Sequence, residues 1–331
     1  MRPPSLNDPL LLLLAGLAID AVFGDMRTVF RLVPHPIVLA GRAIAFLDHK
    51  LNRPQRTERA RRERGILAVL ALVGGAAAIG WLIQALCRGR PVGALMEALL
   101  IGNLVATRSL FLHVAAVSLA LRDGGVEAGR LAVSHIVGRD PARLDRHGIA
   151  RAAIESLAEN FSDGVVAPVF WYLIGGLPGL FAYKMANTAD SMIGYRSERY
   201  RAFGWAAARF DDLVNLAPAR ISGLLLAAAA LFVGEARPVR SLVTMLRDAK
   251  KHRSPNAGWP EAAMAGALGL ALAGPRRYAE GIVEDPWIGN GTARATQADI
   301  ARALRLYYVA CLLLSGGLIV AWIGVHIRLL G

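Results

Sequence analysis

The sequence predicts an all-α, polytopic integral membrane protein with about four to six crossings. Composition is the first reason: of 331 residues, 55% are hydrophobic and 19% are charged, against about 25% charged residues in soluble domains. The mean hydropathy is +0.41. The second reason is charge, since 38 Lys and Arg against 25 Asp and Glu leave a net charge of +13. On so apolar a chain, this surplus is expected in loops that face an anionic cytoplasmic leaflet.

Two apolar segments are long enough to cross a bilayer without interruption. A hydrocarbon core of about 30 Å needs roughly 20 residues of helix, and Ile66–Cys87 and Leu306–Ile327 meet that length. The basic segment Arg42–Arg64 precedes the first of them and holds eight basic and three acidic residues. The positive-inside rule therefore places the start of the Ile66 span on the cytoplasmic side.

Two further segments are long but interrupted. Gly93–Leu121 contains polar residues, among them Glu97 and His113, which are expected to face a protein interior or a cavity. Val165–Tyr183 is broken by Pro168 and by a glycine- and proline-rich stretch. It is either a kinked span or a re-entrant hairpin.

Three shorter apolar runs complete the helical pattern. They are predicted as half-spanning or buried helices, and they cover Leu10–Val22, Ile221–Val233 and Ala262–Ala273. We expect one membrane domain over residues 1–331, whose polar connections, about 122–163, 184–220 and 235–261, form the active site.

Several kinds of chemistry have no signature here. Cys87 and Cys311 form no CxxC pair, the seven histidines are scattered, and there is no GxxxxGK[ST] loop for a nucleotide. Nucleic-acid binding is disfavoured because no aromatic residues alternate with the arginines of the basic segment.

The first polar cluster combines a predicted helix start with acidic residues on one helix face. Asp140 and Pro141 resemble an N-cap and a first helical residue, and a second helix is predicted over Ile149–Asn160. Its Arg151, Glu155 and Glu159 recur every four residues and Asp163 follows. Such carboxylates can bind Mg²⁺ or act as a base; the alternative is a solvated face with an Arg151–Glu155 ion pair.

The second and third clusters pair acids with arginines. One runs from Asn187 through Asp190 to Arg196, and the other holds Asp211 and Asp212. The third also contains Arg209, Asn215 and Arg220. Carboxylates bridge Mg²⁺ to phosphate oxygens, and arginine binds phosphate in a bidentate way. The alternative is that these charges pair with one another at the membrane surface.

The fourth cluster runs from Lys250 to Glu261 and includes His252, Ser254 and Asn256. Pro260 is expected to be the first residue of an Ala- and Gly-rich helix, whose preceding loop can direct backbone N–H groups at an anion. Glu261 is equally consistent with a simple charge near the helix N-terminus. Near the chain start, His35 lies between two prolines and is interpreted as a packing residue.

These motifs together resemble the CobD/CbiB family of cobalamin biosynthesis. The similarity lies in His135–Asp140, Glu155–Trp171, Asn187–Arg196, Arg209–Arg220 and Ser254–Met264, with Pro34–Pro36 and Gly41–Arg42 near the N-terminus. The motifs occur in the family's order over nearly the whole chain. Each is weak alone, but the set is specific.

The resemblance implies an adenosylcobinamide-phosphate synthase. Such an enzyme uses ATP and Mg²⁺ to join adenosylcobyric acid, a corrinoid, to (R)-1-aminopropan-2-ol phosphate or threonine phosphate by an amide bond. Because no P-loop is present, the ATP assignment depends on the resemblance. The expected location is the bacterial inner membrane, with the site facing the cytoplasm, and other late enzymes of the pathway are candidate partners.

We assign the motif residues to three expected roles. Catalytic residues are Glu155, Glu159, Asp163, Asp190 and His135. Metal ligands are Glu155, Glu159, Asp190, Asp211 and Asp212. Substrate and phosphate ligands are Arg139, Lys184, Asn187, Arg196, Arg209, Arg220, Lys250, His252, Ser254, Asn256 and Glu261.

Two other classes of function are also consistent with parts of the pattern. An intramembrane Mg²⁺-dependent prenyl- or alcohol-phosphate transferase would use similar aspartate-rich motifs and would be indifferent to corrinoids. A non-enzymatic corrinoid transporter or scaffold would place its ionisable residues near the bilayer midplane on broken helices. Most acids here lie outside the apolar runs, which favours an enzyme.

Overall fold

The computed structural model describes residues 8–24, 36–137, 141–278 and 281–328, and it is almost entirely helical. The chain divides into two compact units, each made of two stretches of sequence. The first unit comprises the described residues of Met1–Val105 together with Ala167–Asn215. The second comprises those of Ala106–Val166 and Leu216–Leu329.

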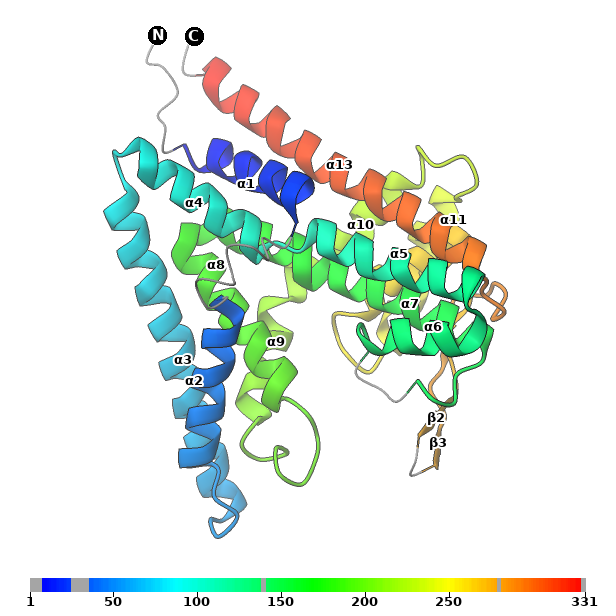
Figure 1. The fold of residues 1–331 in the computed structure, drawn as a ribbon, viewed down its shortest axis with the longest axis horizontal. Coiled ribbons are helices and arrows are strands. Elements are labelled where there is room, and N and C mark those ends of the chain that lie inside the picture. The colour runs from blue at the N-terminus through cyan, green and yellow to red at the C-terminus, as the bar shows by residue number, and fades with distance from the viewer. Residues whose placement is uncertain (1–7, 25–35, 138–140, 279–280, 329–331) are drawn as a thin grey trace. The chain divides into compact units, whose positions relative to one another are not determined.

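The first unit consists of six helices among the described residues. They are α1 Pro9–Phe23, α2 Pro36–Leu51, α3 Glu58–Cys87, α4 Pro91–Leu104, α8 Ala167–Ile193 and α9 Trp205–Val214. The long helix α3 packs along α8, while α1 packs on α4 and α2 on α8 (Figure 1). The core between α2, α3, α8 and α9 is apolar, with Ile44, Val69 and Phe203 buried in it.

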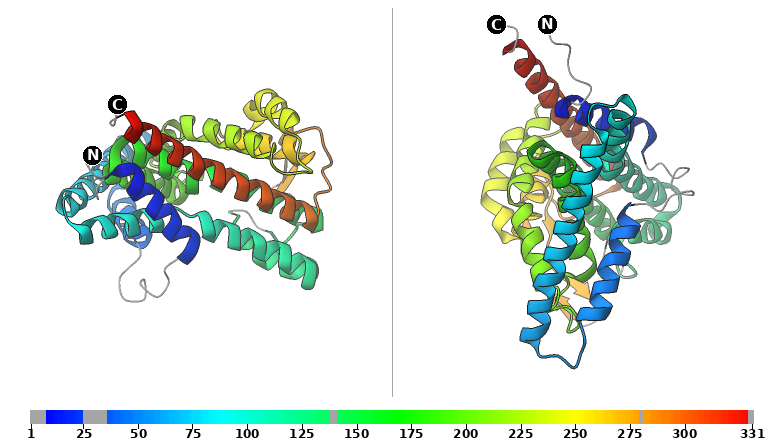
Figure 2. Two further views of the ribbon diagram at one scale, coloured as in Figure 1. Left: turned by 90° about the horizontal axis from the view of Figure 1, so that it is seen from above. Right: turned by 90° about the vertical axis from the view of Figure 1, so that its left-hand side faces the viewer.

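The second unit is built around the C-terminal helix. Its described elements are α5 Thr107–Asp123, α6 Gly125–Ser134, α7 Arg146–Phe161, the π-helical turn η2 Ser162–Val166, α10 Leu216–Ala229, α11 Pro238–Asp248, the 3₁₀ turn η3 Ala249–Lys251, α12 Gly258–Leu268 and α13 Gln297–Arg328. Four short strands lie between α12 and α13: β1 Leu272–Ala273 pairs with β4 Trp287–Ile288, and β2 Arg276–Tyr278 with β3 Gly281–Val283, all antiparallel. Helix α13 packs between α5 and α10 (Figure 2).

The predicted membrane-spanning character is confirmed. Among the described residues, four helical segments are long and apolar enough to cross a membrane, or five if α9 and α10 count as one bent span. The four are Glu58–Cys87, Pro91–Asp123, Arg146–Ile193 and Gln297–Ile327. Large apolar side chains such as Leu67, Trp81 and Val320 are more than 60% exposed on them, as expected for surfaces that contact lipid.

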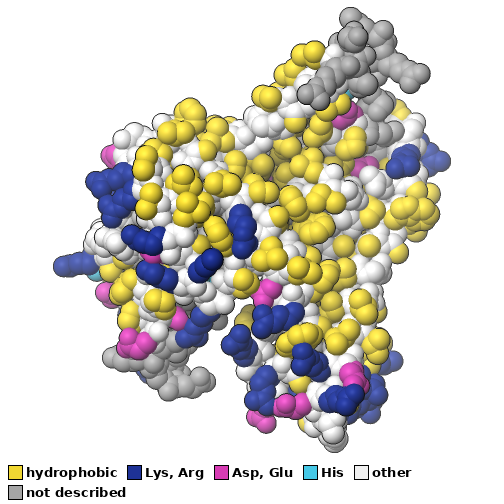
Figure 3. Space-filling model, turned by 180° about the vertical axis from the view of Figure 1, so that it is seen from behind, with side chains coloured by type: hydrophobic (Ala, Val, Ile, Leu, Met, Phe, Trp, Pro, Cys, Tyr) yellow, Lys and Arg dark blue, Asp and Glu magenta, His cyan; other side chains and the backbone are white. Residues whose placement is uncertain are grey.

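Basic and acidic side chains gather at one end of the first unit. Figure 3 shows dark blue and magenta side chains around the start of α3, below a long surface that is mainly hydrophobic. This end contains Arg59–Arg64 of the predicted basic segment. The separation of charge from apolar surface along α3 is the pattern expected where a span leaves the bilayer.

The interrupted segments are helices with local breaks. Helix α8 continues through Pro178 but is kinked at Gly176, whose φ of 59° and ψ of −148° are not helical. The tight space there is filled by Gln84, which also donates to Glu97 Oε1 (3.2 Å), an oxygen that accepts a 2.9 Å hydrogen bond from Tyr172. Polar Glu97 therefore faces the protein interior, as predicted.

The structure shows where one short apolar run ends and where two of the predicted helices begin. The run predicted as Ala262–Ala273 is a buried helix, α12, that ends at Leu268 because Gly269 adopts a left-handed conformation with φ of 69°. The prediction that Pro260 begins it is wrong by two residues, since the helix begins at Gly258. The helix predicted after Pro141 does not form: residues 141–145 make turns, and α7 begins at Arg146 because Asp145 accepts the N–H of Gly148 at 2.7 Å.

A fully buried carboxylate, Asp248, joins three segments of the second unit. It ends α11 and accepts hydrogen bonds from Arg247 (2.6 Å), from Lys251 (2.7 Å) and from the backbone N–H of Gly289 (2.9 Å). The hydrogen bond from Arg247, followed by those from Lys251 and Gly289, lowers the pKa of Asp248 far below its ordinary value, against the opposing effect of burial.

We predict that Asp248→Asn lowers the free energy of unfolding by about 1–2 kcal/mol at neutral pH, because both cations are partly exposed and hydrogen bonds to charged groups contribute about that much. The native pKa is depressed, so the contribution is fully present above the unfolded value of about 3.9 and is lost progressively as pH falls from there through the folded value. Denaturant unfolding in detergent at pH 7 and pH 2 measures both effects. Asp123→Asn, which breaks an exposed pair with Arg122, is the matched control; equal loss in both variants would contradict the assignment.

Candidate functional site

The second and third polar clusters meet at the end of α8 and on α9. Asn187 and Asp190 lie one turn apart on α8, and Asp211 and Asp212 lie on α9. Asp211 is buried and held in place: its two oxygens accept hydrogen bonds from Asn187 (3.4 Å) and Asn215 (3.0 Å). We call Asn187, Asp190, Asp211, Asp212 and Asn215 the aspartate group.

The aspartate group concentrates negative charge. Asp190 is within electrostatic reach of both Asp211 and Asp212, and the carboxylates repel one another. Arg209 donates to Asp212 at 3.2 Å, and Arg196 also attracts Asp212. The expected alternative, pairing between the cluster's own charges, is therefore realised for Arg209, while Asp190 and Asp211 add charge that a cation would neutralise.

The donor set of this group fits Mg²⁺ of the kind found in phosphate-transferring sites. Such ions prefer oxygen ligands and are commonly held by one or two carboxylates together with water and substrate phosphates. Within the part of the chain that the structure describes, no three His, Cys, Asp or Glu side chains form a complete ligand set. The aspartate group can therefore supply part of a coordination sphere, with the substrate supplying the rest.

A single glycine makes room for the Asp190 carboxylate. Gly194 follows the last turn of α8, and its N–H donates to Asp190 O at 2.7 Å. A Cβ atom at residue 194 would overlap Asp190 Oδ1 and would lie 2.8 Å from Cγ. The glycine in the Asn187–Arg196 motif is thus explained by close approach to a site carboxylate.

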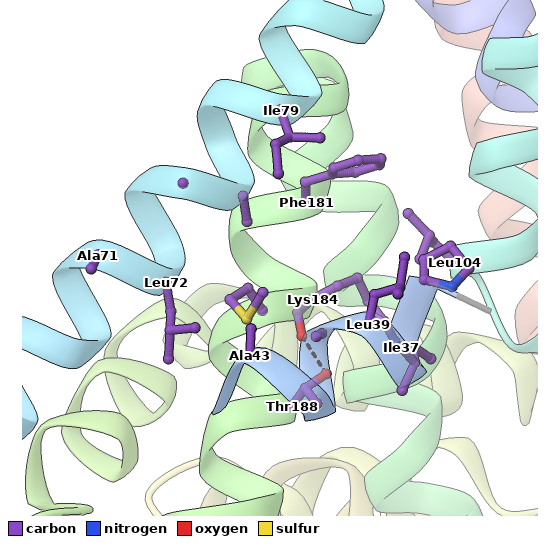
Figure 4. A pocket seen from close by; sticks show the side chains of 15 residues that line it. Ile37, Leu39, Ala43, Ala71, Leu72, Ile79, Leu104, Phe181, Lys184 and Thr188 are labelled. Atoms are coloured by element: carbon purple, nitrogen blue, oxygen red, sulfur yellow. Dashed lines mark hydrogen bonds between the residues drawn. The ribbon is translucent and has the colours of Figure 1, made fainter. Parts of the chain in front are cut away.

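Lys184, expected to bind phosphate, lines a different kind of space. It borders a pocket of about 330 Å³ between α2, α3 and α8 whose other lining residues are mostly aliphatic (Figure 4). Thr188, one turn further along α8, donates to the carbonyl oxygen of Lys184 at 2.7 Å. An apolar lining offers few partners to a phosphate group, so the phosphate role of Lys184 stays a prediction.

The first cluster lies in the second unit, where α7 covers Arg146–Phe161 and confirms the helix predicted over Ile149–Asn160. Glu155 is buried, and its Oε1 accepts the N–H of Ala273 at 2.8 Å. Arg151 donates to the carbonyl oxygen of Ala293. Glu155 and Arg151 therefore hold the backbone that leads into and out of the short strands.

Glu159, Asp163 and His135 lie in more open surroundings. Glu159 is exposed near the end of α7, Asp163 is half-buried in η2, and His135 is exposed at the end of α6. A π-helical turn interrupts regular helical hydrogen bonding and is common at functional sites. Arg139 lies outside the described residues.

His135 borders a polar pocket that the sequence did not reveal. The pocket has a volume of about 340 Å³ and lies between α5, the end of α6, α7 and η2. Its polar lining residues are Ser109, His113, His135, Ser156 and Asn160, and we call it the histidine pocket. His113 was predicted only to face a protein interior or a cavity, and nothing in the spacing of residues 109–164 indicates that these residues converge.

The fourth cluster forms the loop before α12. The Ser254 hydroxyl accepts N–H groups of Asn256 (3.2 Å) and Ala257 (3.3 Å), and His252 Nδ1 accepts the N–H of Ser254 (3.0 Å). Asn256 and Glu261 are buried, with Glu261 3.6 Å from His252 Nε2. The loop is therefore closed by its own side chains.

Two basic residues near this loop, Lys250 and Arg220, lie on neighbouring elements. Lys250 is exposed on η3. Arg220 on α10 stacks over the ring of Trp259 at 4.4 Å and donates to the carbonyl oxygen of Leu216 at 2.5 Å. None of these contacts tests phosphate binding, so the phosphate roles of Arg220 and Lys250 stay predictions.

Comparisons with known proteins agree on one family. A family model described as CobD/Cbib protein matches residues 13–307. A Sinorhizobium sp protein named "Cobalamin biosynthesis protein CobD" is 53% identical over 315 residues, covering 94% of this chain and 98% of the relative. Relatives of the same name from Brucella suis (94% and 96% covered) and Rhodobacter capsulatus (89% and 92%) are each 48% identical. No solved structure matches the chain.

We predict that Gly194→Ala displaces the Asp190 carboxylate and weakens binding of divalent cations by about tenfold, because one ligand leaves the aspartate group. Titration with Mn²⁺ followed by electron paramagnetic resonance measures the change. Gly74→Ala is the control, since a Cβ there meets nothing within 4 Å. Unchanged Mn²⁺ affinity in Gly194→Ala would show that this carboxylate is not a ligand.

Proposed function

We propose, because the chain belongs to the CobD/CbiB protein family, that it is the membrane ligase that makes adenosylcobinamide phosphate during cobalamin biosynthesis. In the proposed reaction, adenosylcobyric acid and (R)-1-aminopropan-2-ol phosphate, or threonine phosphate, are joined by an amide bond. The supporting observation is the match over residues 13–307 to relatives named for cobalamin biosynthesis.

The proposed chemistry divides into activation and attack. A carboxylate oxygen of the corrinoid attacks a phosphorus of ATP, and the expected product is an acyl phosphate with release of ADP. The amine nitrogen then attacks the carbonyl carbon, a C–N bond forms, and the C–O bond to phosphate breaks. The nitrogen loses its extra proton to a base, and phosphate leaves with the electron pair.

The aspartate group and its arginines suit the first half of this reaction. Transfer of a phosphoryl group needs its oxygens oriented and their charge neutralised. Arg209 and Arg196 lie beside Asp212, and each can rotate to a phosphate because both side chains are exposed. When bound, Mg²⁺ would be held by Asp190, Asp211 or Asp212 and would neutralise phosphate oxygens.

The membrane setting supports a site that receives water-soluble polyanions. Asp190 lies in the last turn of α8, and Asp212 lies on α9, after the polar connection that follows α8. Placement in the bacterial inner membrane, with this group on the cytoplasmic side, follows from the proposal and from the basic start of α3.

The decisive experiment is reconstitution. Detergent-purified protein, incubated with adenosylcobyric acid, aminopropanol phosphate, ATP and Mg²⁺, is expected to give the condensed product by mass spectrometry, and none when ATP is omitted. Absence of product with either amine would refute the proposal, and product without ATP would refute the ligase mechanism. Turnover of a prenyl diphosphate instead would favour the transferase alternative.

Substitutions in the same assay test the aspartate group. We predict that Asp190→Asn and Asp212→Asn each lower kcat by about 100-fold, because charge stabilisation at a phosphoryl group is lost. Glu159→Gln tests the predicted role of α7 in the same way. Glu63→Gln, which removes an exposed carboxylate paired with Arg59, should leave kcat unchanged; normal turnover in all three site variants would exclude these acids from catalysis.

A further inference from the structure

The histidine pocket is an open pocket at the surface of the second unit, bordered by the exposed side chains of His113, His135 and Asn160. Its base is fixed by a 3.0 Å hydrogen bond from the N–H of Ala106, where α5 begins, to the carbonyl oxygen of Gly164 in η2. Tyr307 of α13 holds the same corner: its hydroxyl donates to Thr107 O at 2.7 Å, and its ring meets Phe161 edge-on. The walls of the pocket therefore come from helices that are packed against α13.

The hydrogen bonds of His113 fix which nitrogen carries its proton. Nδ1 lies 2.7 Å from the backbone carbonyl oxygen of Ser109. A carbonyl oxygen only accepts, so Nδ1 must be the donor, and the neutral imidazole then carries its lone pair on Nε2. His113 thus lines the pocket with a proton acceptor.

The hydrogen bonds of Asn160 likewise show which of its atoms remains an acceptor. Its Nδ2 donates to Ser156 O at 2.9 Å and to Ser156 Oγ at 3.2 Å. Ser156 Oγ in turn donates to the carbonyl oxygen of Ile136 at 2.8 Å. The amide's donor is committed to this chain, which leaves Asn160 Oδ1 as an acceptor.

The pocket therefore combines acceptors, and its size suits a small ligand. Its volume is about 340 Å³, at the lower end of the range of about 300–1,000 Å³ for pockets that hold small molecules. That space accommodates a short amino-alcohol or amino-acid phosphate. Groups with several N–H donors, above all an ammonium group, complement acceptors such as an imidazole lone pair and an amide oxygen.

We propose that the histidine pocket binds the amine end of the phosphorylated amine substrate, and that Nε2 of His113 accepts its proton. One proton passes from the ammonium nitrogen to Nε2, and the electron pair left on nitrogen attacks the activated carbonyl carbon. Phosphate then leaves with the electron pair of the broken C–O bond and takes up the second proton that the nitrogen loses. The imidazole regains its neutral form by losing that proton to water. This inference rests on the proposed ligase function and adds to it a residue and an amine subsite.

The test compares His113→Ala with His326→Ala in the reconstituted ligase reaction. His326 makes a hydrogen bond of the same kind as His113, from Nδ1 to the carbonyl oxygen four residues earlier (2.9 Å). It lies on α13, outside the pocket. We expect His113→Ala to lower kcat by about 100-fold, the usual contribution of a general base, and to raise KM for the amine while KM for ATP is unchanged. His326→Ala should match the wild type.

An aminooxy analogue of the substrate separates proton transfer from structure. Its nitrogen is unprotonated at neutral pH and needs no base to become nucleophilic, so His113→Ala should turn it over within a few-fold of the wild-type rate. An equal deficit with both nucleophiles, or normal amine kinetics in His113→Ala, would overturn the inference. If the wild type itself makes no product, the ligase proposal fails first.

Two variants at Asn160 keep the inference testable should His113→Ala fold poorly. Asn160→Asp retains the size of the side chain and adds a carboxylate, so it should preserve or tighten binding of the amine, whereas Asn160→Leu removes the acceptor and should weaken it. Calorimetric titration of the detergent-solubilised protein with aminopropanol phosphate measures both. Equal affinity in the two variants would overturn the assignment of Asn160 to the amine.

Discussion

The first unit depends on the hydrogen bonds that the buried carboxylate of Asp48 accepts. It accepts hydrogen bonds from Arg199 (2.6 Å) and Asn52 (2.8 Å), and Asn52 also binds Arg61 of α3 and the backbone of Arg199. The network therefore joins α2 and α3 to the connection between α8 and α9, although Asp48 and Arg199 are 151 residues apart. That connection is thereby fixed between α8, which carries Asp190, and α9, which carries Asp211.

Close backbone packing reinforces the same connection. A Cβ atom at Gly65 of α3 would overlap the carbonyl oxygen of Phe203, so the helix and the α8–α9 connection touch directly. A small residue at this point permits the approach in the way small residues do at helix interfaces in membranes. Positioning of the aspartate group thus depends on α2 and α3, which themselves supply none of its members.

Much of the fold was predictable because apolar length determines which helices cross a membrane. The spans Ile66–Cys87 and Leu306–Ile327 and the helix over Ile149–Asn160 were predicted from local pattern. Local pattern failed at Pro141 and Pro260, where proline is compatible with a helix start but neighbouring side chains set the actual one. Glu155 illustrates the limit for sites: its spacing with Glu159 is regular, yet its partner Ala273 is 118 residues away. The convergence of His113 with Asn160 is likewise a product of packing, which spacing does not encode.

Helix α13 is longer than the hydrocarbon core of a bilayer. Its 32 residues span about 48 Å at 1.5 Å per residue, against a hydrocarbon core of about 30 Å. The excess lies at the N-terminal end, where Arg302 pairs with Asp299 at 2.8 Å and with Glu235 at 3.3 Å. Those ion pairs belong in water or among headgroups, so they fix how deep the helix sits. The first turns of α13 therefore mark the membrane interface for the second unit, and the elements bonded to them lie at the same depth.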